Sequence, residues 1–232
     1  RFLKRVGMGG TGVVNLAVDT HSGFPVAIKS LHASIMHTNP EMSQKLRIEA
    51  NIYLMLTHPN IVKLKNFIVN DTAHLVMEFI DGKPLDEYIS QVTGPIPYGL
   101  SIGMFKEIVL GIGYAHNKRI AIPGYDGVLH LDIKPDNILI TNTGEIKIID
   151  YGISQGSSEE RSDKIMGAPM YMSPEHYDLS KKLDRRTDIY SLGVLFHQMI
   201  TGKAPYNRSI QVSELKDNIT NEPLERIQKV YP

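Results

Sequence analysis

Two short apolar runs separated by a turn, with polar residues at their outer ends, constrain this chain more than any other stretch. The runs are residues 138–140 and 146–149, and the segment between them is Thr-Asn-Thr-Gly-Glu. This pattern predicts a β-hairpin. The outer ends of an antiparallel hairpin lie together, so Asn137, before the first run, and Asp150, after the second, should lie side by side.

The residues at this predicted hairpin end suit a metal ion. Amide and carboxylate oxygens are good ligands for Mg²⁺, a hard cation that also keeps several waters. Asp132 precedes Asn137 by five residues, on the loop that leads into the hairpin. The sequence therefore predicts a metal site at Asn137 and Asp150, with Asp132 facing a substrate beside it.

A glycine-rich stretch near the start has the pattern Gly-x-Gly-x-x-Gly, formed by Gly7, Gly9 and Gly12. Residues 13–19 alternate in the period of a strand, whereas a dinucleotide-binding fold would need a helix there. The glycines thus join two strands, and they let backbone N–H groups approach phosphate oxygens without a Cβ in the way. The Gly-x-x-x-x-Gly-Lys-Ser/Thr pattern is absent from the sequence, so a Walker-type site is not supported.

A lysine and a glutamate form a candidate ion pair. Lys29 ends the predicted strand 26–29, and Glu49 lies on the predicted helix 42–56. Apolar residues three before, four after and seven after Glu49 place its carboxylate on the apolar stripe of that helix. A charge on a buried face is costly unless it is paired, and Lys29 is the obvious partner.

Taken in order, these features resemble the eukaryotic-type (Hanks-type) protein kinases. The glycine-rich loop is followed by Val-Ala-Ile-Lys, the helix glutamate, His-Leu-Asp at 130–132, Asp-Tyr-Gly at 150–152 and Ser-Pro-Glu at 173–175. The resemblance covers essentially the whole chain and is closest to the serine/threonine class, in a style similar to bacterial members. It implies a kinase that transfers the γ-phosphate of ATP, with Mg²⁺, to a protein hydroxyl.

The resemblance also implies a role for each matching residue. Asp132 would accept the substrate proton, Lys134 would contact the transferred phosphate, and Asn137 and Asp150 would bind Mg²⁺. The pair of Lys29 and Glu49 would position the α- and β-phosphates. The nucleotide would meet the glycine-rich loop, the apolar residues around adenine and the hinge backbone, that is Val6, Gly7, Gly9, Gly12, Val14, Ala27, Lys29, Glu78, Ile80 and Leu139.

The implied fold is α+β and two-lobed. Residues 1–80 would form a small, mainly β lobe with one key helix, and residues 81–232 a larger, mainly α lobe that we expect to be truncated at its C-terminal end. Within the second lobe, residues 100–116 predict a helix whose apolar side chains, among them Ile102 and Val109, belong to the core. A further helix is predicted at 187–200. Asp188 near its start is either a helix-start carboxylate or, by the resemblance, a buried anchor for the catalytic-loop backbone.

Composition restricts the class of protein and the partners that we expect. The 232 residues are 42% hydrophobic, carry zero net charge and include no cysteine. This is ordinary for a globular protein, and it gives no indication of nucleic-acid binding or of a disulfide framework. No apolar run approaches the ~18 residues that span a bilayer. We expect a cytoplasmic protein with ATP and a protein substrate as partners and no membrane segment in this chain, although an anchor could lie outside it.

Several positions depart from the family pattern. Leu131 replaces an arginine that receives activation-loop phosphate in many members, so we expect activity without that phosphate. Ala168 replaces a threonine that hydrogen-bonds the catalytic Asp and Lys, which weakens the expectation of a high rate. Lys134 still favours Ser/Thr over Tyr as the substrate residue. Residues 121–127 look like an inserted surface loop, and we find no clear arginine partner for Glu175.

Two other functions are alternatives to that of an active protein kinase. A pseudokinase that binds ATP as a scaffold would be expected to lack at least one of Lys29, Asp132, Asn137 and Asp150, and all four are present. A small-molecule phosphotransferase of related fold is disfavoured, because residues 170–175 resemble the peptide-docking segment of protein kinases.

Overall fold

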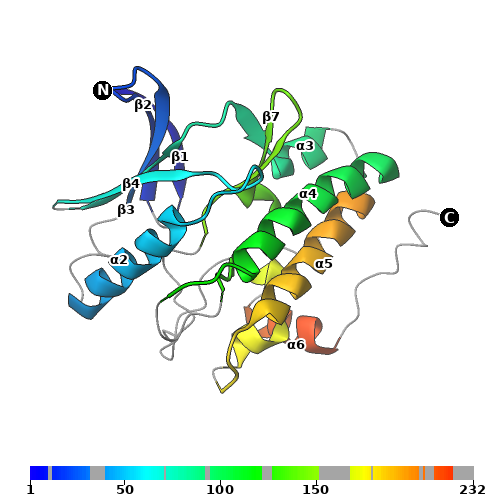
Figure 1. Cartoon of the computed structure of the whole chain (residues 1–232). Helices are drawn as coiled ribbons and strands as arrows, with labels where there is room; N and C mark the ends of the chain where they lie inside the picture. Colours follow the sequence, from blue (N-terminus) through cyan, green and yellow to red (C-terminus); the bar gives the residue numbers. More distant parts are fainter. Residues whose placement is uncertain are drawn as a thin grey trace. The chain divides into compact units, whose positions relative to one another are not determined.

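The computed structural model describes residues 1–9, 12–31, 40–70, 72–91, 95–121, 127–151, 168–178, 180–203, 206 and 212–221. The chain divides into two compact units, Arg1–Asp81 and Gly82–Pro232 (Figure 1). The first unit is mainly β and the second mainly α, which is the α+β class predicted from the sequence.

The first unit is built on a five-stranded antiparallel sheet in the order β1-β2-β3-β5-β4. Its strands are β1 (Phe2–Gly9), β2 (Gly12–Val18), β3 (Pro25–Leu31), β4 (Leu64–Val69) and β5 (Ala73–Glu78). Side chains of β5 alternate between buried and half-buried, as the two-residue period of a strand requires. The glycine-rich stretch joins β1 to β2, which confirms the predicted strand–loop–strand arrangement.

Among the described residues of this unit, one helix, α2 (Pro40–Leu54), accompanies the sheet. It begins and ends two residues earlier than the sequence predicts. The end differs because the N–H groups of Met55 and Leu56 donate to the carbonyls of Ile52 and Tyr53, each at 3.0 Å. These i to i−3 bonds tighten the last turn into 3₁₀ geometry. Leu56 is nevertheless buried, so its predicted place in the core is confirmed.

The second unit combines helices with a three-stranded sheet in the order β6-β7-β8. Its elements are β6 (Gly82–Pro84), α3 (Leu85–Gln91), α4 (Tyr98–His116), η1 (Pro135–Asn137), β7 (Ile138–Thr141), β8 (Ile146–Ile148), η2 (Pro169–Tyr171), η3 (Pro174–Tyr177), α5 (Arg185–Thr201) and α6 (Val212–Asn221). β7 and β8 pair antiparallel, which confirms the predicted hairpin. Gly144 in its turn has a φ of 86°, a conformation that glycine adopts at no steric cost.

Helices α4 and α5 lie side by side in this unit (Figure 1), and the rings of Phe105 and Phe196 pack with centroids 4.4 Å apart. Ile108 and Ile112 of α4 are fully buried. The prediction was wrong for Ile102 and Val109, which are 43% and 40% exposed. They lie seven residues apart, hence on one side of the helix, and that side is turned away from the buried stripe.

Helix α5 is defined at both ends by capping. The Asp184 side chain accepts a hydrogen bond from the backbone N–H of Arg186 at 2.8 Å and so caps the N-terminus. Gly202 ends the helix in the left-handed conformation, with φ 68°. Because Asp184 is the cap, Asp188 is available for another role one turn into the helix.

Candidate active site

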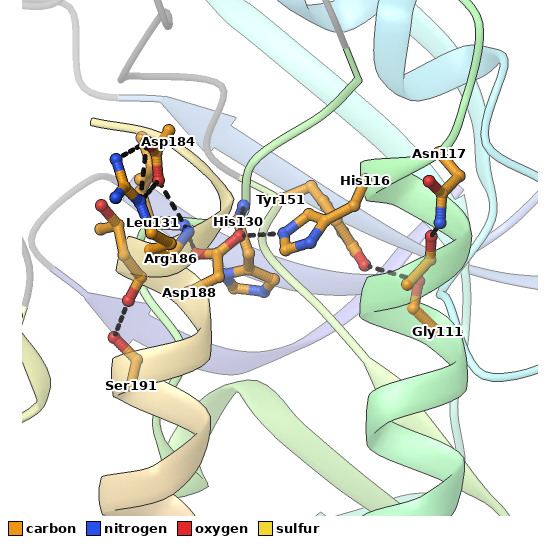
Figure 2. Close-up of polar contacts among 12 residues, drawn as sticks. Gly111, His116, Asn117, His130, Leu131, Tyr151, Asp184, Arg186, Asp188 and Ser191 are labelled. Atoms are coloured by element: carbon orange, nitrogen blue, oxygen red, sulfur yellow. Dashed lines mark hydrogen bonds and ion pairs between the residues drawn. The ribbon is translucent and has the colours of Figure 1, made fainter. Parts of the chain in front are cut away.

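A buried carboxylate holds the loop that carries Asp132. Asp188 has no solvent exposure, and its Oδ2 accepts the N–H of His130 while its Oδ1 accepts the N–H of Leu131, each at 2.8 Å (Figure 2). Leu131 has a φ of 61°, a left-handed conformation that costs a non-glycine residue about 1–2 kcal/mol. Asp188 therefore anchors a strained loop backbone, and the alternative of a simple helix-start carboxylate is not what the structure has.

A histidine completes this anchor. Nε2 of His116, the last residue of α4, lies 2.7 Å from Oδ2 of Asp188 (Figure 2). A carboxylate can only accept hydrogen bonds, so Nε2 is the donor. Gly127 packs against this histidine so closely that a Cβ there would lie 2.2 Å from the His116 carbonyl oxygen. This pair was not predicted from the sequence, in which the only signal is a histidine at the end of a predicted helix.

The Asp132 carboxylate is surrounded by donors. Its Oδ2 accepts from Nζ of Lys134 at 2.7 Å and from Nδ2 of Asn137 at 2.8 Å. Its Oδ1 accepts from the backbone N–H of Ala168 at 3.3 Å. The Asp132 side chain is 26% exposed, so it is oriented by the protein and still reachable from solvent. Such an arrangement suits a group that receives a proton from a bound hydroxyl.

Asn137 and Asp150 lie at the same end of the hairpin, as predicted. The N–H of Ile149 donates to the carbonyl of Asn137 at 3.0 Å, which ties the two outer ends together. Nδ2 of Asn137 also donates to the Asp132 carbonyl at 2.8 Å. The amide oxygen Oδ1 of Asn137 therefore points away from Asp132. Asp150 has a φ of 60°. An amide oxygen and a carboxylate carried at one hairpin end would suit a Mg²⁺ ion that takes its remaining ligands from water and phosphate.

His130 and Tyr151 pack against each other. Their ring centroids are 4.7 Å apart. Nε2 of His130 lies 3.0 Å from the Ile149 carbonyl oxygen, and the Tyr151 hydroxyl donates to the Gly111 carbonyl at 3.4 Å. These contacts join the loop, the hairpin end and α4 within one unit.

The glycines of the glycine-rich stretch differ in what their surroundings require. A Cβ at Gly12 would lie 2.1 Å from the Ser30 carbonyl oxygen, so close packing of β2 on β3 alone requires glycine there. A Cβ at Gly7 would make only ordinary contact, 3.7 Å from Val14 Cβ. Close approach of the backbone to phosphate therefore stays a prediction for Gly7 and Gly9.

The predicted nucleotide residues of the first unit lie on four strands and one helix. Lys29 is on β3, and Glu49 is on α2 with 8% exposure, so the predicted burial of that carboxylate is confirmed. Their mutual pairing stays a prediction. The others are Val6, Gly7 and Gly9 on β1, Gly12 and Val14 on β2, Ala27 on β3 and Glu78 at the end of β5, with Ile80 just beyond it. Leu139 is on β7 in the second unit.

Glu175 has a partner that was not predicted from the sequence. The hydroxyl of Thr187 donates to Glu175 Oε1 at 2.9 Å. Burial acts to raise the pKa of Glu175, but hydrogen bonds from its own backbone N–H and from Ser173 and Thr187 outweigh burial and hold that pKa below its usual value. The segment before α5 is thus joined to the start of that helix.

Gly152 of the Asp-Tyr-Gly motif and residues 122–126 of the inserted loop lie outside the described residues, as does the rest of the segment 153–167. Within the described parts of the chain, the helices are too short or too polar to cross a bilayer. The same parts hold no group of three His, Cys, Asp or Glu side chains placed to bind a metal. A site built from one amide, one carboxylate and phosphate oxygens would not form such a group.

Comparison with known proteins agrees with this geometry. A family model described as the protein kinase domain matches residues 1–231. The chain is 30% identical to serine/threonine-protein kinase pkn2 of Myxococcus xanthus, over 97% of this chain and 27% of that protein. It is 32% identical to PknA of Mycobacterium tuberculosis, over 89% of this chain and 47% of that protein. It is 33% identical to PrkC of Bacillus subtilis, over 92% of this chain and 32% of that protein.

The chain therefore spans less than half the length of these curated relatives. The match to the family model nevertheless runs through both compact units, from the glycine-rich stretch to beyond α6. On that match, and on the loop and hairpin geometry described above, the chain belongs to the protein kinase family.

Proposed function

We propose that the chain is an ATP-dependent protein serine/threonine kinase. The observation that carries the proposal is the Asp132 carboxylate, which is half-buried and oriented by Lys134 and Asn137 on a loop that Asp188 anchors. A pseudokinase has no need of such an arrangement, because a scaffold does not require an oriented proton acceptor. The names of the relatives support the serine/threonine class.

In the proposed reaction a serine or threonine hydroxyl of the substrate docks against Asp132. Its oxygen attacks the γ-phosphorus of ATP, the bond from that phosphorus to the β,γ-bridging oxygen breaks, and ADP leaves. The hydroxyl proton passes to the Asp132 carboxylate. Lys134, whose ammonium group already lies 2.7 Å from Asp132, supplies positive charge next to the transferred phosphoryl group.

Asn137 and Asp150 are the residues that would hold magnesium. A bound Mg²⁺ would neutralise charge on the phosphates and align them for in-line transfer. Because both N–H bonds of the Asn137 side chain are directed at Asp132, its Oδ1 is the atom available to the metal. The Asn137 amide therefore links the proton acceptor to the metal site.

The first unit would bind the nucleotide. Lys29, paired with Glu49, would contact the α- and β-phosphates, and the glycine-rich stretch would cover them. The N–H of Glu78 already donates to the Lys63 carbonyl at 3.0 Å. A contact from Glu78 to adenine would therefore use its carbonyl, and Ile80 would supply an N–H donor.

The test is Mg²⁺-dependent transfer of labelled γ-phosphate from ATP to the chain itself and to a generic basic protein. Asp132→Asn and Lys29→Met should each abolish transfer. The matched controls are Asp136→Asn, at an exposed residue of the same loop, and Lys65→Met, at an exposed residue of β4. Both should retain transfer. Phosphoamino-acid analysis of the product should give phosphoserine or phosphothreonine.

The alternative is an ATP-binding scaffold of low activity. It predicts ATP binding in the parent chain with no transfer above that of Asp132→Asn. This outcome would overturn the proposal and leave the nucleotide site in place.

A further inference from the structure

The two oxygens of the Asp132 carboxylate are not equivalent. Each carboxylate oxygen offers two in-plane lone pairs. Oδ2 receives two donors, Lys134 Nζ and Asn137 Nδ2, at 2.7 and 2.8 Å. Oδ1 receives one donor among the described residues, the backbone N–H of Ala168 at 3.3 Å. A substrate hydroxyl therefore finds its open lone pair on Oδ1.

We propose that the backbone N–H of Ala168 is a positioning group that orients Asp132 so that Oδ1 faces the substrate hydroxyl. This inference rests on the proposed function and deepens it. The N–H occupies one lone pair of Oδ1 and thereby restricts rotation of the carboxylate about its last side-chain bond. Lys134 and Asn137 restrict the other oxygen, so the carboxylate plane is held from both sides.

The direction of this N–H is set by the fold around it. Ala168 precedes η2 with an extended backbone, and its carbonyl accepts the N–H of Tyr171 at 3.0 Å. η2 is itself tied down, because the Ser191 hydroxyl of α5 donates to the Tyr171 carbonyl at 2.7 Å. The Tyr177 hydroxyl donates to the Pro169 carbonyl at 2.8 Å. The donor is thus aimed before any substrate binds, which lowers the cost of reorganisation in the reaction.

This arrangement also explains how alanine can occupy this position. Alanine has no hydroxyl with which to contact Asp132, but the backbone N–H is present whatever the side chain. The contact joins Asp132, on the loop after α4, to the segment that leads into α5. A shift of that segment would therefore rotate the carboxylate as well as move the surface on which a substrate peptide would lie.

The decisive variant replaces the alanine at position 168 with lactic acid, its α-hydroxy analogue. The replacement is made by suppressing a stop codon at that position with a tRNA that carries lactic acid. The replacement turns the amide N–H into an ester oxygen and leaves the side chain unchanged. We expect kcat for peptide phosphorylation to fall about tenfold, equal to about 1.4 kcal/mol. The KM values for ATP and peptide should not change, because the contact orients the base and does not bind either substrate.

Three comparisons make the result specific. The same alanine-to-lactate replacement at exposed Ala121 controls for the ester itself and should leave kcat unchanged. Ala168→Gly keeps the N–H and should lose much less than the ester. In the background of Asp132→Asn, measured by single turnover, the ester should have no further effect. The asparagine oxygen takes the place of Oδ2 beside Lys134 and Asn137, so its NH₂ faces the N–H of Ala168 and no acceptor is left for that N–H.

The inference is overturned if the ester at 168 leaves kcat within about twofold of the parent, which is less than one-third of the expected 1.4 kcal/mol. It is equally overturned if the ester lowers the residual rate of Asp132→Asn by the same factor as in the parent. If the ester protein does not fold, hydrogen exchange of the Ala168 amide is measured instead. The inference requires this exchange to be faster in Asp132→Asn than in the parent, and an equal rate would overturn it. A failure of Asp132→Asn to lower activity would instead refute the proposed function.

Discussion

The substitution Asp188→Asn tests the anchor of the catalytic loop. Asp188 is fully buried and accepts three hydrogen bonds, from the N–H groups of His130 and Leu131 and from Nε2 of His116. Asparagine has the same shape but one acceptor oxygen. If that oxygen takes the place of Oδ2, it keeps the contacts to His130 and His116. The side-chain NH₂ then faces the N–H of Leu131, donor against donor.

The cost follows from these unmet groups. A buried donor left without a partner costs about 1–3 kcal/mol, and here two donors oppose each other while the hydrogen bonds that remain lose their charge. We expect a loss of about 3 kcal/mol in the free energy of unfolding. For a chain of this size, each kcal/mol lowers Tm by about 2–4 °C, so Tm should fall by about 6–12 °C. The released strain at Leu131 would offset part of this loss, but it would also let the loop leave its active geometry.

The assay is thermal unfolding followed by circular dichroism, together with phosphoryl transfer at a temperature where both proteins are folded. Asp184→Asn is the matched control, because Asp184 is a largely exposed N-cap and asparagine caps helices equally well. It should change Tm and activity little. A Tm for Asp188→Asn within about 2 °C of the parent would refute the reasoning, since that shift corresponds to less than 1 kcal/mol.

Three further predictions concern a glycine, a carboxylate and the catalytic-loop leucine. Gly127→Ala should destabilise more than Gly144→Ala in urea unfolding: both have positive φ, but only at Gly127 would the new Cβ meet a backbone carbonyl, at 2.2 Å, and equal losses would contradict this. The pKa of Glu175 is lower in the folded protein than its usual value of 4.5. The ionised carboxylate therefore stabilises the fold fully above pH 4.5, and this stabilisation is lost as pH falls through the folded pKa. Urea unfolding between neutral pH and about pH 3 should therefore show a shallower loss of stability in Glu175→Gln than in the parent, and parallel curves would count against it. Because Leu131 cannot bind phosphate, phosphatase treatment should leave transfer activity intact, and abolished activity would show that a phosphorylated residue is required.

Local pattern predicted the strands and the hairpin around this candidate site correctly. The hairpin of β7 and β8 follows from two apolar runs around a turn, and it brings Asn137 and Asp150 to one end. The strand–loop–strand arrangement at the glycine-rich stretch follows from a period of two after Gly12. These predictions succeed because backbone dihedral preferences and the period of apolar residues act over a few neighbouring positions.

Exposure on α4 shows where local pattern is insufficient. Ile102 and Val109 have the same apolar character as Ile108, yet only Ile108 is buried. Periodicity identifies a helix and its apolar side chains. Which of them become buried depends on where other elements pack, and in this unit α5 and β8 contact α4.

Local sequence pattern predicts the candidate residues Asp132, Lys134, Asn137 and Asp150, together with the strands, helices and turns that carry them. The way in which Asp132 and its loop are held depends instead on tertiary contacts. Asp188 reaches Leu131 from 57 residues away and His116 from 72, and the N–H of Ala168 reaches Asp132 from 36. The physical reason is that a hydrogen bond requires a donor and an acceptor within about 3 Å, and between distant residues this distance is set by the packing of whole elements.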